Sequence, residues 1–262
     1  MTPEEVRRTQ VEILAWVDRF CRERDIRYYL WAGTLLGAVR HSGFIPWDDD
    51  IDLAMPRPDY ERFCSEFRGD DHLTLYTTET DRDYGYPFAR VADTRTRIVE
   101  ASRIAIPMGV NVDVFPLDGW PGNRWLSLLH RARLTLNHGL VAAWTLRPGP
   151  RRFSRAVVLG AVGLVVKRLP VRYLTRRITR VATRCPVDGS AFMGVTTFRY
   201  MERVASAAYG SPSAVEFEGA SYPGPHDPDL VLRNLYGDYM TVPPEAERPV
   251  PRHAHEAFWL DH

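Results

Sequence analysis

The feature that most constrains this chain is an acidic run that passes directly into apolar sequence. Residues 48–53 read Asp-Asp-Asp-Ile-Asp-Leu. Alternate side chains of an extended strand point to the same face, so Asp50 and Asp52 are predicted to share one face, with Asp48 as a further candidate. Carboxylates packed this closely repel one another. A divalent cation that prefers oxygen ligands, Mg²⁺ or Mn²⁺, is the compensation that the pattern predicts.

Two other interpretations of the run are weaker. A solvated acidic turn is the ordinary meaning of an isolated acidic run, but the flanking Trp47 and the apolar residues after Asp50 do not fit a solvated loop. An EF-hand loop matches at its first three ligand positions. Its sixth position, however, is Leu53 where glycine is needed, and its twelfth is Asp59 where glutamate is needed.

Two features elsewhere in the chain become candidates for the same site when they are considered together with this run. Ala32, Gly33 and Thr34 are expected to form a turn between a strand at 26–31 and a short helix, and backbone N–H groups at such a turn can contact a phosphate. Glycine before a helix is more often only a turn. Asp113 lies on an alternating strand that Pro116 is expected to end, where a lone acid is commonly a surface residue.

Composition sets outer limits on function. A chain of 262 residues with 45% hydrophobic residues can form one large domain, or one domain with an insertion. The net charge of +1 gives no reason to expect nucleic acid as a partner. Three widely spaced cysteines fit neither a disulfide framework nor a zinc cluster, which predicts a reducing cytoplasm. The charged start is unlike a signal peptide, and no apolar run is long enough for a membrane-spanning helix.

The chain divides into three segments. Residues 1–122 are expected to form a mixed α/β catalytic core, and residues 185–262 to complete that domain with one helix at 227–236. Residues 123–184 are expected to be a basic helical insertion. Within this insertion, 151–168 is a candidate for contact with an anionic membrane, against the alternative of a buried helix with arginines at its rim.

Shorter elements are also predicted. A helix is expected from Pro3 to about Arg24, and another from Asp59 to Phe67. A strand is expected over 48–55, and further strands at 73–77, 86–92, 96–100 and 110–115. In the tail, His253 and His255 are candidates either for the site or for the surface.

Four blocks of the sequence resemble the LicD family. The first, residues 31–55, is long and specific, and 56–63, 111–118 and 236–244 continue the likeness. That family includes bacterial phosphocholine transferases and resembles the fukutin-type pentitol-phosphate transferases. The resemblance implies an α+β nucleotidyltransferase-like fold, in which a mixed β-sheet is flanked by helices. The region 123–184 is only loosely similar to the family.

The resemblance also implies a reaction. A CDP-activated alcohol gives its phosphoalcohol to a hydroxyl of a glycan or related acceptor, and CMP leaves. By position, Asp50 and Asp52 would bind the metal, Asp113 would be a third ligand or the base, and Gly33 and Thr34 would contact phosphate. The candidate cations that would bind the diphosphate are Arg40, His41, Arg57 and Arg90. Each of them could equally be a surface residue or a partner of the acidic strand.

Two further hypotheses stay open. A nucleotidyltransferase that modifies a small molecule or a protein would need the same acidic strand and would release pyrophosphate. A non-catalytic binding module on the same fold would be expected to have lost the carboxylates or the Gly-Thr turn, and all of these are present.

Overall fold

A computed structural model describes most of the chain. The described residues are 1–99, 106–145, 166–198, 201–248 and 256–260. The greater part of the basic stretch 151–168 therefore lies outside them, as do His253 and His255.

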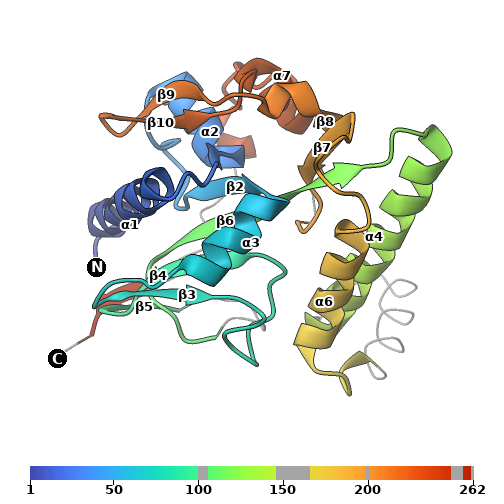
Figure 1. Cartoon of the computed structure of the whole chain (residues 1–262). Coiled ribbons are helices and arrows are strands. Elements are labelled where there is room, and N and C mark those ends of the chain that lie inside the picture. The colour runs from blue at the N-terminus through green and yellow to red at the C-terminus, as the bar shows by residue number, and fades with distance from the viewer. Residues whose placement is uncertain (100–105, 146–165, 199–200, 249–255, 261–262) are drawn as a thin grey trace.

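The centre of the fold is a mixed β-sheet, in which β1, β2, β6, β4 and β3 lie side by side in that order and β7 and β8 continue from β6 (Figure 1). β2 and β6 pair in parallel, and the other neighbours pair antiparallel. This sheet with its flanking helices confirms the predicted α+β class. The strand bounds are β1 Tyr29–Leu30, β2 Asp52–Pro56, β3 Leu73–Tyr76, β4 Ala89–Asp93, β6 Asn111–Trp120, β7 Phe192–Val195 and β8 Val204–Ala205.

Helices cover the sheet and carry its core. α1 packs on β6 and β4, and α3 packs on β2 and β6. Leu14 and Val17 of α1 and Phe63 of α3 are fully buried against Leu53 and Val114 of these strands. α2 packs between β2, α7 and the β9–β10 hairpin. The bounds are α1 Pro3–Glu23, α2 Ala32–His41, α3 Arg57–Glu66, α7 Pro228–Tyr236, β9 Ser213–Phe217 and β10 Ala220–Gly224.

The remaining described elements lie around this centre. α4 (Arg124–Thr145) and α6 (Val171–Ala182) pack along each other beside the sheet and share a small apolar core around Leu134 and Ile178 (Figure 1). The others are β5 Thr96–Val99, which pairs with β11 Glu256–Trp259, and the short 3₁₀ helices η1 Ser206–Tyr209 and η2 Glu245–Glu247. Within the described part of the chain, no helix has the length and apolar character needed to cross a membrane.

One sequence prediction fails at Pro116, because β6 continues through it to Trp120. A proline has no N–H to donate to a neighbouring strand, so it is rare in a central strand, which pairs along both of its edges. On one edge, however, β6 pairs with β4 up to Val114 and with β7 only from Leu117 onward. Pro116 lies in the gap between these two partners, so its missing N–H disrupts no pairing there.

Three predicted boundaries were also wrong. β2 begins at Asp52, because residues 48–51 form an irregular loop. α3 begins at Arg57 instead of Asp59, since Pro58 is tolerated in the first turn of a helix, where its missing N–H has no partner to lose. The expected turn around Gly33 is the first turn of α2 itself.

The packing generates a stability prediction. Leu53→Ala empties a fully buried position on β2, and we expect it to lower the free energy of unfolding by about 2–5 kcal/mol in urea denaturation. Leu126→Ala is the matched control, because that side chain is 57% exposed on α4. It should change the free energy by less than about 0.5 kcal/mol. Equal losses at both positions would contradict this core.

Candidate functional site

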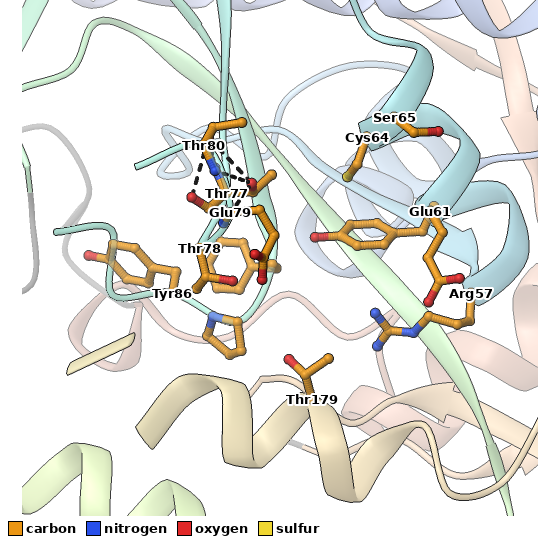
Figure 2. A pocket seen from close by; sticks show the side chains of 13 residues that line it. Arg57, Glu61, Cys64, Ser65, Thr77, Thr78, Glu79, Thr80, Tyr86 and Thr179 are labelled. Atoms are coloured by element: carbon orange, nitrogen blue, oxygen red, sulfur yellow. Dashed lines mark hydrogen bonds between the residues drawn. The ribbon is translucent and has the colours of Figure 1, made fainter. Parts of the chain in front are cut away.

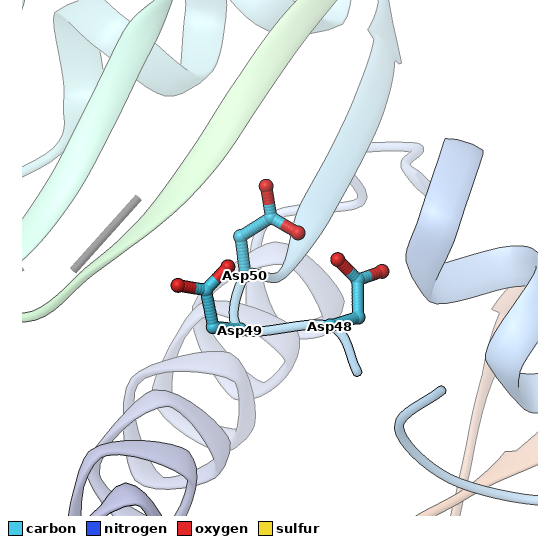
Figure 3. Close-up of side chains that lie close together, drawn as sticks. All are labelled: Asp48, Asp49 and Asp50. Atoms are coloured by element: carbon cyan, nitrogen blue, oxygen red, sulfur yellow. The ribbon is translucent and has the colours of Figure 1, made fainter. Parts of the chain in front are cut away.

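The acidic loop is held in place by α1. Arg7 donates from Nη2 to the carbonyl oxygens of Pro46 and Asp48, each at 3.0 Å. Gln10 donates from Nε2 to the carbonyl oxygen of Asp49 at 3.0 Å. Because these contacts use the backbone of the loop, its carboxylate side chains project away from α1 (Figure 3).

The strands beyond the loop align two more acids. Asp52 and Asp113 are direct neighbours in the parallel pairing of β2 with β6. The backbone N–H of Asp52 donates to Thr34 Oγ1 at 2.8 Å. Asp113 Oδ1 accepts a hydrogen bond from Asn111 Nδ2 at 2.7 Å. Backbone pairing thus places the acidic end of β2 beside the middle of the sheet.

Arg90 is the cation at this cluster. It is the neighbour of Asp113 on β4, and its Nε lies 2.9 Å from Asp113 Oδ1. Its Nη2 donates to Asp113 Oδ2 at 3.3 Å, and both side chains are buried. Asp52, Asp113 and Arg90 therefore lie in line across three adjacent strands.

The carboxylates strongly affect one another's protonation. Burial raises the pKa of Asp50 to about 7, with further contributions from the charges of Asp113 and Asp49. Burial also raises the pKa of Asp52 well above its ordinary value, and the charges of Asp50 and Asp113 add to this. Arg90 opposes both shifts. Arg90 thus offsets part of the charge of the cluster.

The donor set fits a hard divalent cation. Asp48, Asp49 and Asp50 are half-buried and bring carboxylate oxygens within 4.8 Å of one another (Figure 3). The predicted ligand set was different: Asp50, Asp52 and Asp113. Asp50 lies close to Asp48 and Asp49, and its charge also raises the pKa of Asp52, so it belongs to both sets. All these donors are carboxylate oxygens, which suit Mg²⁺ or Mn²⁺.

Gly33 and Thr34 shape the site from α2. A Cβ added at Gly33 would lie only 2.5 Å from Oδ2 of Asp48, so a side chain there would displace the carboxylate of Asp48. Thr34 holds Asp52 through the hydrogen bond described above. Both residues support the carboxylates in this structure, and their contact with a phosphate stays a prediction.

Three of the four candidate cations lie away from the carboxylates or are already paired. Arg40 and His41 are at the far end of α2, about 10 Å along the helix from Gly33. Arg40 donates to the carbonyl oxygen of Tyr239 at 2.7 Å. Arg57 forms a two-nitrogen ion pair with buried Asp118, at 2.8 and 2.7 Å. Arg90 is the one of these four that contacts the cluster.

Other residues contribute that sequence patterns did not single out. Desolvation of its phenol and the charges of Asp52, Asp48 and Asp50 raise the pKa of Tyr236, so this residue lies near the cluster although it is 46% exposed. Tyr236 and Asn111 each begin a block that resembles the LicD family, and that was the available signal for them. Arg7 and Gln10 lie on the ordinary amphipathic helix α1, which gave no such signal.

A buried acid beside the start of α2 ties the C-terminal part of the chain to the site. Glu202 accepts hydrogen bonds from Trp31 Nε1 at 3.2 Å and from the hydroxyl of Tyr209 at 2.8 Å. Burial raises the pKa of Glu202 to about 7. Trp31 is the residue that directly precedes α2, so Glu202 fixes the start of the helix that carries Thr34.

The pKa of Asp50 yields a pH prediction. It is raised from 3.8 to about 7, so the folded chain binds more protons than the unfolded chain between these values. Stability must therefore fall as the pH rises through that window. In thermal melts with EDTA, we expect the wild type to lose more stability from about pH 4 to pH 7 than Asp50→Asn does.

Mg²⁺ supplies the second half of this test. Above the window, excess Mg²⁺ should raise the melting temperature of the wild type, since a ligand that binds the folded state stabilises it. It should leave Asp50→Asn nearly unchanged. Parallel pH profiles for the two proteins, with no response to Mg²⁺, would contradict the crowded-carboxylate description.

Comparison with known proteins agrees with this geometry. The family model "LicD/FKTN/FKRP, nucleotidyltransferase domain" matches residues 25–135, which include α2, the acidic loop and the strands β1 to β6. The lipopolysaccharide cholinephosphotransferase LicD of Haemophilus influenzae is 29% identical over 262 residues, which cover 95% of each chain.

Shorter matches fall on other relatives. Ribitol 5-phosphate transferase FKRP of human and of mouse is 48% identical over 44 residues, which cover 17% of this chain and 9% of each relative. An uncharacterized protein of Rickettsia prowazekii is 51% identical over 37 residues, or 14% of either chain. The domain match and the similarity along almost the whole chain agree with the acidic site: residues 25–135 match the LicD family model, and the chain is similar to LicD of Haemophilus influenzae.

Proposed function

We propose that the chain is a metal-dependent phosphotransferase that moves a phosphoalcohol from a CDP-activated donor to a hydroxyl of a glycan or related acceptor, with release of CMP. As a LicD-type enzyme, it is a transferase of phosphorus-containing groups. The relatives named above transfer phosphocholine and ribitol 5-phosphate, which supports phosphoalcohol transfer in glycan modification. The donor, the metal and the leaving CMP are our inference from the chemistry of the site.

The observation that carries the proposal is the crowding of the carboxylates. Burial and mutual repulsion raise the pKa values of Asp50 and Asp52, so their ionised forms are costly in this arrangement and a cation bound beside them would favour ionisation. Phosphoryl transfer depends mostly on positioning and on charge neutralisation around the phosphate. A bound Mg²⁺ or Mn²⁺ would be held by these carboxylates and would offset the charge of the diphosphate.

The protein's own groups orient the reaction. In the transfer, the acceptor oxygen bonds to the phosphorus that carries the alcohol, the bond from that phosphorus to the oxygen of CMP breaks, and the acceptor proton must leave. Asp113 faces this region, and Arg90 and Asn111 fix its carboxylate. It is placed either to complete the ligand set or to take the proton, the two roles that the family resemblance implies for it.

A nucleotidyltransferase remains the second candidate, because the matching family model describes a nucleotidyltransferase domain. It would use the same acidic cluster with a nucleoside triphosphate and would release pyrophosphate. The two functions differ in product, so a single assay of both products separates them.

Product analysis tests the proposal. With Mg²⁺ or Mn²⁺ and a panel of CDP-choline, CDP-ribitol and nucleoside triphosphates, we expect CMP from a CDP-alcohol. Asp50→Asn and Asp52→Asn should each lower the rate by about 100-fold or more, while the exposed Asp71→Asn should retain it. Pyrophosphate with the same dependence on metal and aspartates would replace the proposal with nucleotidyl transfer. The absence of both products would overturn it.

Arg90→Lys tests the fixed geometry of Asp113. Lysine keeps the charge but cannot reproduce the two-nitrogen contact, so we expect kcat to fall by about tenfold or more with the fold intact. Arg95→Lys is the matched control, because Arg95 forms a similar pair with Asp93 farther along the same region, at 3.0 and 2.6 Å. A similar kcat for the two variants would exclude a role for Arg90 in the reaction.

A further inference from the structure

A cavity of about 370 Å³ opens between α3, the segment 77–88 and α6 (Figure 2). This volume is in the range of small-molecule sites. None of Asp48, Asp50, Asp52 and Asp113 lines it, so it is distinct from the carboxylate cluster. Seven of its thirteen lining residues carry a hydroxyl group, and two of these seven are tyrosines.

One wall is rigid and rich in hydroxyl groups. Thr77 Oγ1 accepts hydrogen bonds from the backbone N–H groups of Glu79 and Thr80, each at 3.1 Å, and Thr80 Oγ1 accepts from the N–H of Thr77 at 2.8 Å (Figure 2). The side-chain hydroxyls of Thr78 and Thr179 form no hydrogen bond with any residue that the structure describes. They are therefore available to a ligand.

The cations around the cavity are already neutralised. Arg57 pairs with Asp118, and Arg176 of α6 pairs with Glu79 at 2.5 Å. Burial alone would lower the pKa of Arg57, but the charge and hydrogen bonds of Asp118 raise it, with smaller contributions from residues that include Glu61. Among the described residues that line the cavity, a phosphate would find no unpaired guanidinium, which is the group that usually binds it.

The aromatic rings are likewise engaged. The guanidinium of Arg57 lies 5.2 Å from the ring centroid of Tyr60, and that of Arg90 lies 4.2 Å from the ring centroid of Tyr86. A quaternary ammonium group binds by covering such faces. It would have to approach rings that already carry arginine cations, so the lining suits neither choline nor phosphate. The hydroxyl groups of Thr78 and Thr179 remain beside a largely apolar lining, and a neutral, hydroxylated group with an apolar ring face can meet both.

The cavity adjoins the carboxylate cluster through one side chain. Arg90 contacts Tyr86 on the cavity side and forms the ion pair with Asp113 on the other. Its far wall comes from Thr179 of α6, outside the matched domain of residues 25–135. Arg176 holds α6 against the threonine wall by donating to the carbonyl oxygen of Thr78 at 3.3 Å.

We propose that this cavity binds a neutral, polyhydroxylated group, either a sugar ring of the acceptor or the pentitol of the donor, beside the carboxylate cluster. The assignment of the group to the acceptor or the donor rests on the proposed function. The binding of a polyol in the cavity does not.

Direct binding is the first test, measured by saturation-transfer NMR on the full chain. The probes are galactose, N-acetylgalactosamine and ribitol, with choline and inorganic phosphate for contrast. Thr179→Trp should fill the cavity and weaken polyol binding by about tenfold or more. Thr183→Trp, on an exposed position one turn farther along, should bind polyols like the wild type. Thr179→Val removes only the hydroxyl and should weaken binding to a smaller extent, and thermal melts verify that each variant folds.

Kinetics then separates the two sources. With an active donor, a rise in the KM for the acceptor in Thr179→Trp assigns the cavity to the acceptor sugar. A rise in the KM for CDP-ribitol, but not for CDP-choline, assigns it to the donor pentitol. Unchanged KM values for every substrate would overturn the assignment to this reaction.

The outcomes distinguish this inference from the proposed function. Asp50→Asn should bind polyols normally while it loses CMP release. Suppose that the wild type binds polyols but releases no CMP, and that Thr179→Trp loses polyol binding. The cavity assignment then stands and the proposed function fails. If no polyol binds the wild type, or if Thr179→Trp instead removes binding of choline, the inference about the cavity is wrong.

Discussion

Mutual repulsion among closely spaced, half-buried carboxylates is the constraint on which the site depends. Asp50 and Asp52 resist ionisation in the folded chain, because burial and neighbouring charges both favour their protonated forms. Such an arrangement persists only where other contacts hold it together. Arg7 and Gln10 hold the loop by its backbone, Gly33 leaves room for Asp48, and Thr34 fixes the first residue of β2.

β6 connects this cluster with the rest of the molecule. Asp113 near its start pairs with Arg90, and Asp118 near its end pairs with Arg57. The two acids are five positions apart, so the two ion pairs lie at different places along β6. One strand thus carries two buried ion pairs, one beside the carboxylates and one at the cavity next to α6. The continuation of β6 through Pro116, in the gap between β4 and β7, is what permits this arrangement.

The sequence predicted Asp50, Asp52 and Asp113 from strand alternation and from the block resemblance, and their roles stay a prediction. Asp52 and Asp113 are neighbours on β2 and β6, whereas Asp50 lies in the irregular loop before β2, where strand alternation does not apply. Arg57 could not be placed from sequence, since its partner Asp118 is sixty-one positions away. Asp49 and Tyr236 were missed for a similar reason: their proximity to the cluster arises from the loop geometry and from the packing of α7. The sequence wrongly predicted that the strand ends at Pro116. A proline in the sequence does not show whether its N–H position would face a paired strand or the gap between β4 and β7.

The position of a bound metal tests the role of the carboxylates most directly. Crystals soaked in Mn²⁺ and measured at its absorption edge locate the ion by anomalous scattering. We predict a peak about 2.1–2.2 Å from carboxylate oxygens of Asp50 and Asp52, with Asp113 adjoining it. A peak bound only by Asp48 and Asp49 would contradict the assignment of β2 and β6 as the metal-binding strands. No peak at the cluster would contradict the claim that a cation relieves its charge.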